Sequence, residues 1–135
     1  MPDKEPMDEA MIALLANTVE RITQRDANNA TRAAAKPEKF LAWLDSYFNQ
    51  EHADHVATQL APVLRVAGGL DVPVAESLAQ SQAQLYRRGM HDAILEASGH
   101  ATPAELSDAV ATLFKTRNEF TWQNAARILK EVCHA

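Results

Sequence analysis

Residues 37–48 of this 135-residue chain read PEKFLAWLDSYF and hold four of the eight aromatic residues (two Trp, two Tyr and four Phe). Pro37 suits the first turn of a helix, and Lys36 before it is disfavoured in helical geometry, so a helix should begin here. Four of its large apolar residues share one helix face, namely Phe40, Leu44, Tyr47 and Phe48. This segment therefore predicts the main core helix, or an interface if part of it stays exposed.

The composition around this segment favours helices throughout. The chain contains 25 Ala, only four Gly and 47% hydrophobic residues, and alanine is the strongest helix former. Apolar stripes at helical spacing occupy residues 7–22, 51–67, 72–98, 103–114 and 121–134, and no alternating strand pattern is present. We predict an all-α fold, a compact bundle of five or six helices with no sheet. Residues 1–135 should form a single domain whose residues 1–6 are a disordered N-terminus.

Several residues predict where the helices end. The large apolar residues of the first helix stop at Ile22, and Asn28 and Asn29 favour a break soon after it. Pro62 should kink or divide the third helix near Leu60, and Gly68 and Gly69 should end it. We expect Ser98 and Gly99 to stop the long fourth helix, and Thr102, Pro103 and Glu105 to form a capping box.

The charge pattern bears on nucleic-acid binding. The formal net charge is −5, which argues against a general nucleic-acid binder, whose affinity comes from neutralising phosphates. Arg21, Arg25 and Arg32 are spaced four and seven residues apart, so they form one basic stripe along the first helix. In a monomer this stripe is a solvated face, whereas in an assembly of several copies it could face nucleic acid.

A second nucleic-acid hypothesis rests on residues 103–132, which resemble two helices around a turn. The second helix would present polar and basic side chains outward, namely Gln123, Asn124, Arg127 and Lys130. However, the intervening KTRNEF turn is longer than in a helix-turn-helix and lacks glycine. DNA is therefore a weaker partner prediction than protein.

The segment Glu51–His55 most resembles an enzyme or metal site. His52 and His55 lie three residues apart on one helix face and could bind zinc if Asp45, Glu51 or His91 supplied a third ligand. The His-Glu-x-x-His spacing of metalloproteases is absent. The alternative is a polar helix face with one histidine packed beside the aromatic residues. We predict no metal, no cofactor, no catalytic residue and no enzyme activity, since no nucleophile elbow or phosphate-binding loop occurs either.

Two further features of the sequence indicate where in the cell the protein resides. No stretch of eighteen apolar residues occurs, so we expect no membrane partner. The acidic, polar N-terminus does not resemble a signal or transit peptide, and a single cysteine excludes a disulfide within the chain. We predict that the protein resides in the cytoplasm.

A series of short motifs runs through roughly residues 12–66, namely Val19-Glu20-Arg21-Ile22, Arg25, Phe40-x-x-Trp43, Tyr47-Phe48, His52-x-x-x-Val56 and Leu60-Ala61-Pro62. In this order, the motifs resemble the C-terminal helical region of portal proteins from tailed bacteriophages. The resemblance implies a ring-forming head component whose helical region faces the capsid interior and packaged DNA, located in the cytoplasm of a host cell or in a virion. A whole portal subunit is several times longer and has stem, clip and wing regions that do not fit here. The family is structural, so the resemblance transfers no catalytic residue.

The predicted function is therefore a non-enzymatic phage or prophage assembly protein with a portal-like helical domain. It would act by self-association as a homo-oligomer or by docking another protein. The predicted interface residues are Phe40, Trp43, Tyr47 and Phe48, with Met11 and Leu15 in a second apolar stripe. The alternative is a small helical phage-type regulator that binds a host protein or DNA.

Overall fold

The computed structural model describes residues 9–116 of the chain. This part consists of five α-helices and no strand, which confirms the all-α bundle. The helices are α1 (Glu9–Ala33), α2 (Pro37–Tyr47), α3 (Gln50–Gly68), α4 (Val72–His100) and α5 (Leu106–Thr116). None of these helices is both long and apolar enough to span a membrane.

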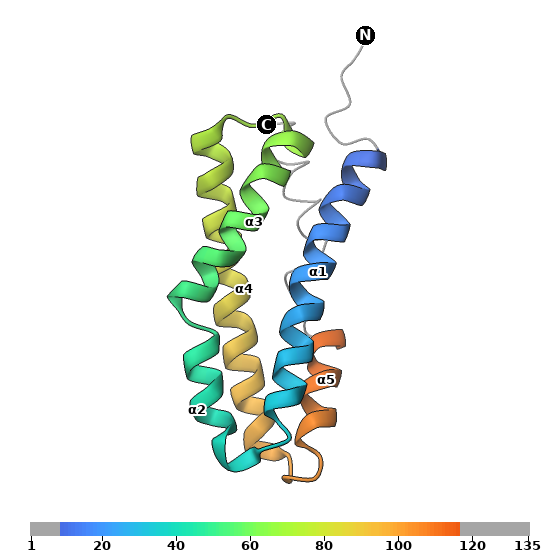
Figure 1. The fold of residues 1–135 in the computed structure, drawn as a ribbon, viewed down its shortest axis with the longest axis vertical. Coiled ribbons are helices and arrows are strands. Elements are labelled where there is room, and N and C mark those ends of the chain that lie inside the picture. The colour runs from blue at the N-terminus through green and yellow to red at the C-terminus, as the bar shows by residue number, and fades with distance from the viewer. Residues whose placement is uncertain (1–8, 117–135) are drawn as a thin grey trace.

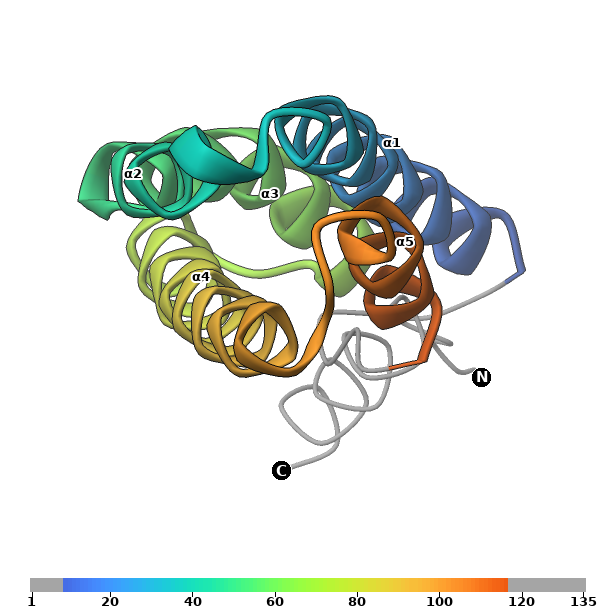
Figure 2. The same cartoon turned by 90° about the horizontal axis from the view of Figure 1, so that it is seen from below.

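The helices form antiparallel columns along the long axis of the molecule. Figure 1 shows α1 running down one column, α2 and α3 following each other back up a second, α4 returning the full length, and α5 beside the lower part of α1. The end-on view in Figure 2 shows these columns around a common interior. The most extensive packing joins α3 to α4, and α1 packs against both α3 and α5.

Helix α1 is longer than its large apolar residues predict. It continues through Asn28 and Asn29 to Ala33, so the expected break is wrong. Small residues extend its buried face, and Ala30 is fully buried. Asn29 Nδ2 donates to the hydroxyl of Tyr47 at 3.0 Å, and Gln24 Nε2 donates to Asn28 Oδ1 at 2.9 Å. Tertiary packing and these side-chain bonds therefore outweigh the low helix propensity of asparagine.

The other helix ends follow the sequence more closely. Helix α2 begins at Pro37, and α3 ends before Gly69, which has the left-handed φ of 64° that glycine tolerates. Helix α3 is not divided at Pro62, because that residue is on its solvent-exposed side, away from the buried Leu60.

The end of α4 and the start of α5 differ slightly from expectation. Helix α4 continues through Gly99 to His100, since one glycine in a last turn costs only about 1 kcal/mol. Beyond it, the backbone N–H of Thr102 donates to Glu105 Oε1 at 3.4 Å, which is one of the two bonds of the expected capping box.

The core runs the length of the bundle and contains side chains from all five helices. Its largest fully buried members are Leu15, Ile22, Phe40, Leu44, Phe48, Val56, Leu60, Tyr86, Met90, Ile94 and Val110. The helix of residues 37–47 therefore contributes to the core through its Phe40 and Leu44 face, as the first of the two sequence interpretations holds.

Candidate functional site

The second column of the bundle is interrupted between α2 and α3, near the middle of the molecule (Figure 1). Asn49 makes this joint: its Oδ1 accepts a hydrogen bond from the backbone N–H of His52 at 3.0 Å, and its Nδ2 donates to the carbonyl of Ser46 at 2.7 Å. The asparagine thereby caps the N-terminus of α3 and ties it to the end of α2. Tyr47, Phe48 and His52 surround this joint.

A buried carboxylate organises the interior at the joint. Asp26 of α1 is completely inaccessible to solvent. Its Oδ1 accepts from the hydroxyl of Tyr47 at 2.6 Å, and its Oδ2 accepts from the hydroxyl of Tyr86 at 2.6 Å and from His52 Nε2 at 2.9 Å. These four residues, here called the Asp26 cluster, join α1, α2, α3 and α4. A buried carboxylate is tolerated because these donors replace its water.

The imidazole of His52 is enclosed by aromatic rings. Its ring centroid lies 4.9 Å from that of Phe48, 5.1 Å from Tyr47 and 5.9 Å from Tyr86. The hydrogen bond to Asp26 assigns a proton to Nε2, while Nδ1 is buried without a hydrogen-bond partner. The ring thus packs beside the aromatic residues, and neither nitrogen is open to an outside molecule.

The two tyrosines of the cluster are held in their neutral form. Burial raises the pKa of Tyr47 to about 12, and its hydrogen bond to Asp26 adds to the shift. Burial also raises the pKa of Tyr86 well above 10, aided by the negative charge of Asp26 and the bond to it. An ionised phenol beside a buried carboxylate would lose its hydrogen bond and meet like charge. Both hydroxyls therefore remain donors well above neutral pH.

Alkaline titration should report on this arrangement, because Tyr47 and Tyr86 are the only tyrosines in the chain. In the unfolded chain both should ionise near pH 10, whereas the folded pKa of Tyr47 is about 12 and that of Tyr86 is also raised. The unfolded state loses its protons first, so stability is fully present below pH 10 and decreases as the pH rises through 12. We expect no phenolate absorbance at pH 10 until the protein unfolds. A normal titration near pH 10 in the folded protein would contradict the cluster.

A shallow pocket opens beside the cluster, between α1 and the α2–α3 joint. His55 and Arg25 contribute to its wall. His55 Nε2 accepts from Arg25 Nη1 at 3.1 Å and from Gln59 Nε2 at 2.8 Å, so its proton is on Nδ1. The expected pair of histidines is therefore split, with His52 bonded inward to Asp26 and His55 bonded to Arg25 on the surface.

The three residues that could have supplied a third metal ligand do not join the two histidines. His91 of α4 binds Asp45 of α2, with 2.8 Å between Nε2 and Oδ1, and Glu51 is exposed at the pocket. Within residues 9–116, no three His, Cys, Asp or Glu side chains are grouped so that they could hold a metal ion.

The predicted interface residues divide into two groups. Phe40, Phe48 and Leu15 expose at most 1% of their surface, so in this fold they are core and a partner cannot touch them. Trp43 and Tyr47 are half-buried, and their rings stack with centroids 4.8 Å apart. The side chain of Met11 lies outside the described part. The expectation of an exposed aromatic interface thus fits only Trp43 and Tyr47, because α1 and α4 cover the other face of α2.

The three arginines of the predicted stripe lie on the surface, but they differ in exposure and in their contacts. Arg21 and Arg32 are exposed, while Arg25 bonds to His55 and its Nε lies 3.8 Å from Asp26 Oδ1. The second helix of the hypothetical helix-turn-helix, with Gln123, Asn124, Arg127 and Lys130, lies outside the described residues.

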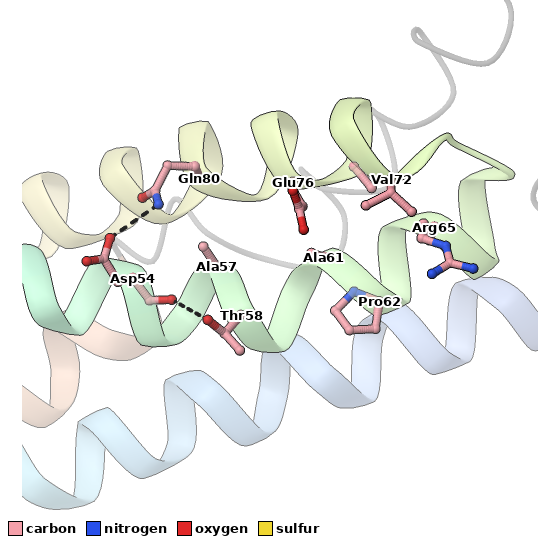
Figure 3. Close-up of a pocket in the computed structure, with 10 residues that line it drawn as sticks. Asp54, Ala57, Thr58, Ala61, Pro62, Arg65, Val72, Glu76 and Gln80 are labelled. Carbon is pink, nitrogen blue, oxygen red and sulfur yellow. Dashed lines mark hydrogen bonds between the residues drawn. The ribbon is translucent and has the colours of Figure 1, made fainter.

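An open groove with a volume of about 460 Å³ lies between α3 and α4. Figure 3 shows Ala57 and Ala61 of α3 facing α4 across it, and Ala75 and Val72 of α4 complete an apolar lining. Two acidic side chains lie at its rim. Asp54 Oδ1 accepts a hydrogen bond from Gln80 Nε2 at 3.2 Å, and Glu76 projects toward the opening (Figure 3). The groove therefore has a small-residue floor and a negative rim.

Pro62 adds a polar feature to this groove. A proline has no N–H, so the carbonyl of Thr58, four residues earlier, lacks its α-helical donor. Thr58 and Pro62 both line the groove, as does Arg65 at its upper end.

Comparisons of this chain with protein-family models, curated proteins and solved structures returned no match. The site is therefore interpreted from its own geometry.

Sequence reasoning missed Asp26, Tyr86 and the groove. One signal for Asp26 was available, because it continues the buried spacing of Leu15, Val19 and Ile22 and so places a carboxylate in an apolar stripe. Tyr86 stood in an apolar series and could not be distinguished from an ordinary core residue. The groove depends on two helices that are adjacent only in the fold.

Proposed function

We propose that this protein is a non-enzymatic assembly module of a phage or prophage, similar to the C-terminal helical region of tailed-phage portal proteins. It acts by self-association and by docking other proteins, within the host cell or the virion. The observation that carries the proposal is the open α3–α4 groove. Surface hollows with an apolar floor and a charged rim are typical of protein-binding sites, because apolar contact stabilises the complex and charge selects the partner.

The polar interior supports a structural role in place of catalysis. The most enzyme-like residue, His52, is 8% exposed, bonded to Asp26 and covered by aromatic rings. A general base must reach its substrate within hydrogen-bond distance. The Asp26 cluster instead links four helices, which gives an assembly module a rigid surface.

Native mass tests the proposed function. We expect sedimentation velocity of the full chain at neutral pH to show a mass several times the 14.9 kDa of one copy, increasing with concentration. A strict monomer at every concentration would contradict self-association. Neighbouring capsid and terminase genes are the second expectation, and their absence would count against the phage context.

The arginine stripe favours a second candidate, a small helical regulator that binds DNA or a host protein. Arg21, Arg25 and Arg32 present cations from one face of α1. If this candidate holds, duplex DNA binding should weaken steeply with added salt and lose affinity when Arg32 is replaced by alanine. Binding that is absent at low salt would eliminate the DNA form of this candidate.

A further inference from the structure

Two oxidisable side chains lead from the surface of α2 to the Asp26 cluster. Trp43 is half-buried, and its ring stacks on that of Tyr47 with centroids 4.8 Å apart and planes inclined by 18°. The hydroxyl of Tyr47 in turn donates to Asp26 Oδ1 at 2.6 Å. Tryptophan and tyrosine are among the side chains that lose a single electron most readily. Here they are in contact with each other, and the tyrosine is bonded to a base.

The Asp26 carboxylate is placed to take the proton of Tyr47. Its Oδ1 accepts from Tyr47, whereas Tyr86 and His52 both donate to Oδ2. A phenol that has lost an electron is a strong acid, so it passes its proton along an existing hydrogen bond. The bond to Oδ1 is short, as is usual when the acceptor is charged. Because burial raises the pKa of Tyr47 to about 12, the phenol keeps its proton at neutral pH until an electron leaves.

The charges in the interior favour this transfer. A Trp43 side chain that has lost one electron is a radical cation, and Asp26 is a buried anion. When an electron moves from Tyr47 to Trp43 and the phenolic proton moves to Asp26, three neutral groups result, namely an intact indole, a phenoxyl radical and a carboxylic acid. Removing a buried charge is favourable in a medium of low dielectric constant. Arg25 Nε, 3.8 Å from Asp26 Oδ1, opposes the protonation only weakly, because water screens its 41% exposed side chain.

We propose that Trp43, Tyr47 and Asp26 form a one-electron relay, which converts an oxidised Trp43 into a phenoxyl radical on Tyr47 and a protonated Asp26. The oxidant is a small radical in solution that removes one electron from the half-buried indole. Tyr47 lines the shallow pocket between α1 and the α2–α3 joint, so a small one-electron reductant such as ascorbate can return the electron there. The proton then moves back from Asp26 to Tyr47. The relay gives an oxidised Trp43 a reversible route of repair, and it does not depend on self-association.

Tyr86 shares the carboxylate with Tyr47 but has different ring neighbours. Its ring packs against Phe48 and His52, with centroids 6.4 and 5.9 Å away, and it is 1% exposed. Its hydroxyl bonds to Asp26 Oδ2, so removing that hydroxyl leaves the bond between Tyr47 and Oδ1 in place. The two tyrosines therefore offer a matched pair of substitutions, each of which removes one hydroxyl from the cluster.

Pulse radiolysis of the full chain tests the relay. Azide radicals remove one electron from tryptophan, and the absorption of the tryptophan radical should then decay as that of a tyrosyl radical grows, at a rate independent of protein concentration. Tyr47→Phe and Trp43→Phe, which leaves only Trp122, should each slow this transfer by about tenfold or more, whereas Tyr86→Phe should keep it. Asp26→Asn retains the shape of the side chain but not the base, so it should also slow the transfer by about tenfold or more. Circular dichroism confirms that each variant is folded.

Four results would overturn the relay. The first is a transfer that is absent from the wild type or unchanged by Tyr47→Phe or Trp43→Phe. The second is a Tyr86→Phe variant as slow as Tyr47→Phe, because the loss of either hydroxyl would then have the same effect. The third is a folded Asp26→Asn variant that transfers at the wild-type rate. If that variant does not fold, heavy water replaces it: the wild type should transfer more slowly there because the phenolic proton moves, and equal rates in heavy and ordinary water are the fourth.

Discussion

Replacing Asp26 by alanine should lower the free energy of unfolding by about 3–5 kcal/mol, the largest effect of any single polar substitution in residues 9–116. The substitution leaves the hydroxyls of Tyr47 and Tyr86 and the Nε2–H of His52 buried without their acceptor. Each buried donor that loses its partner costs about 1–3 kcal/mol, and the three lie too close together for water to satisfy all of them at no cost. Urea unfolding followed by circular dichroism measures the change.

Two matched variants make this prediction specific. Asp54→Ala removes an exposed carboxylate of α3 and should change stability by no more than about 0.5 kcal/mol. Asp26→Asn keeps one carbonyl acceptor and the shape of the side chain, so its loss should fall between the two. If Asp26→Ala were as mild as Asp54→Ala, the cluster would not link the four helices.

Replacing Phe48 by alanine should cost about 3–5 kcal/mol, which distinguishes a core residue from an interface residue. Phe48 is 1% exposed, and its ring packs against Trp43, Tyr47, His52 and Tyr86, with centroids between 4.9 and 6.4 Å away. Removing it opens a cavity at the joint that the hydrogen-bonded cluster cannot close by moving inward. Thermal unfolding at a concentration where the protein is monomeric measures the loss.

The control for Phe48 lies on α2, the helix that Phe48 follows directly. Leu41 is 51% exposed, so Leu41→Ala should cost less than about 1 kcal/mol. An interface role for Phe48 would show the reverse pattern, with intact stability and weakened self-association. That result would contradict the placement of the aromatic face of α2 in the core.

The parts of this fold that depend on local sequence were predictable. Pro37 starts α2 because its φ suits a first turn, and Gly69 ends α3 because it accepts a left-handed backbone. Periodic apolar residues identified every described helix. The errors came where distant contacts override local preference: Asn29 stays helical because it binds Tyr47, and Pro62 is tolerated because it faces solvent.

The candidate sites were less predictable for the same physical reason. The arginine stripe is a property of one helix, so its spacing already placed Arg21, Arg25 and Arg32 on one face. The groove needs α3 and α4 side by side, and a carboxylate from one pairs with an amide from the other, as Asp54 does with Gln80. No local pattern in either helix contains that information.

By itself, the amino-acid sequence determined the helices, most of their ends and the faces they bury, because these follow from backbone geometry and from the spacing of apolar residues. The tertiary structure alone decided that Asp26 is the centre of the interior. Its partners are 21, 26 and 60 residues away, and they can supply hydrogen bonds only once α1, α2, α3 and α4 have packed together. It also decided that the aromatic face of α2 is covered and that an open groove lies between α3 and α4.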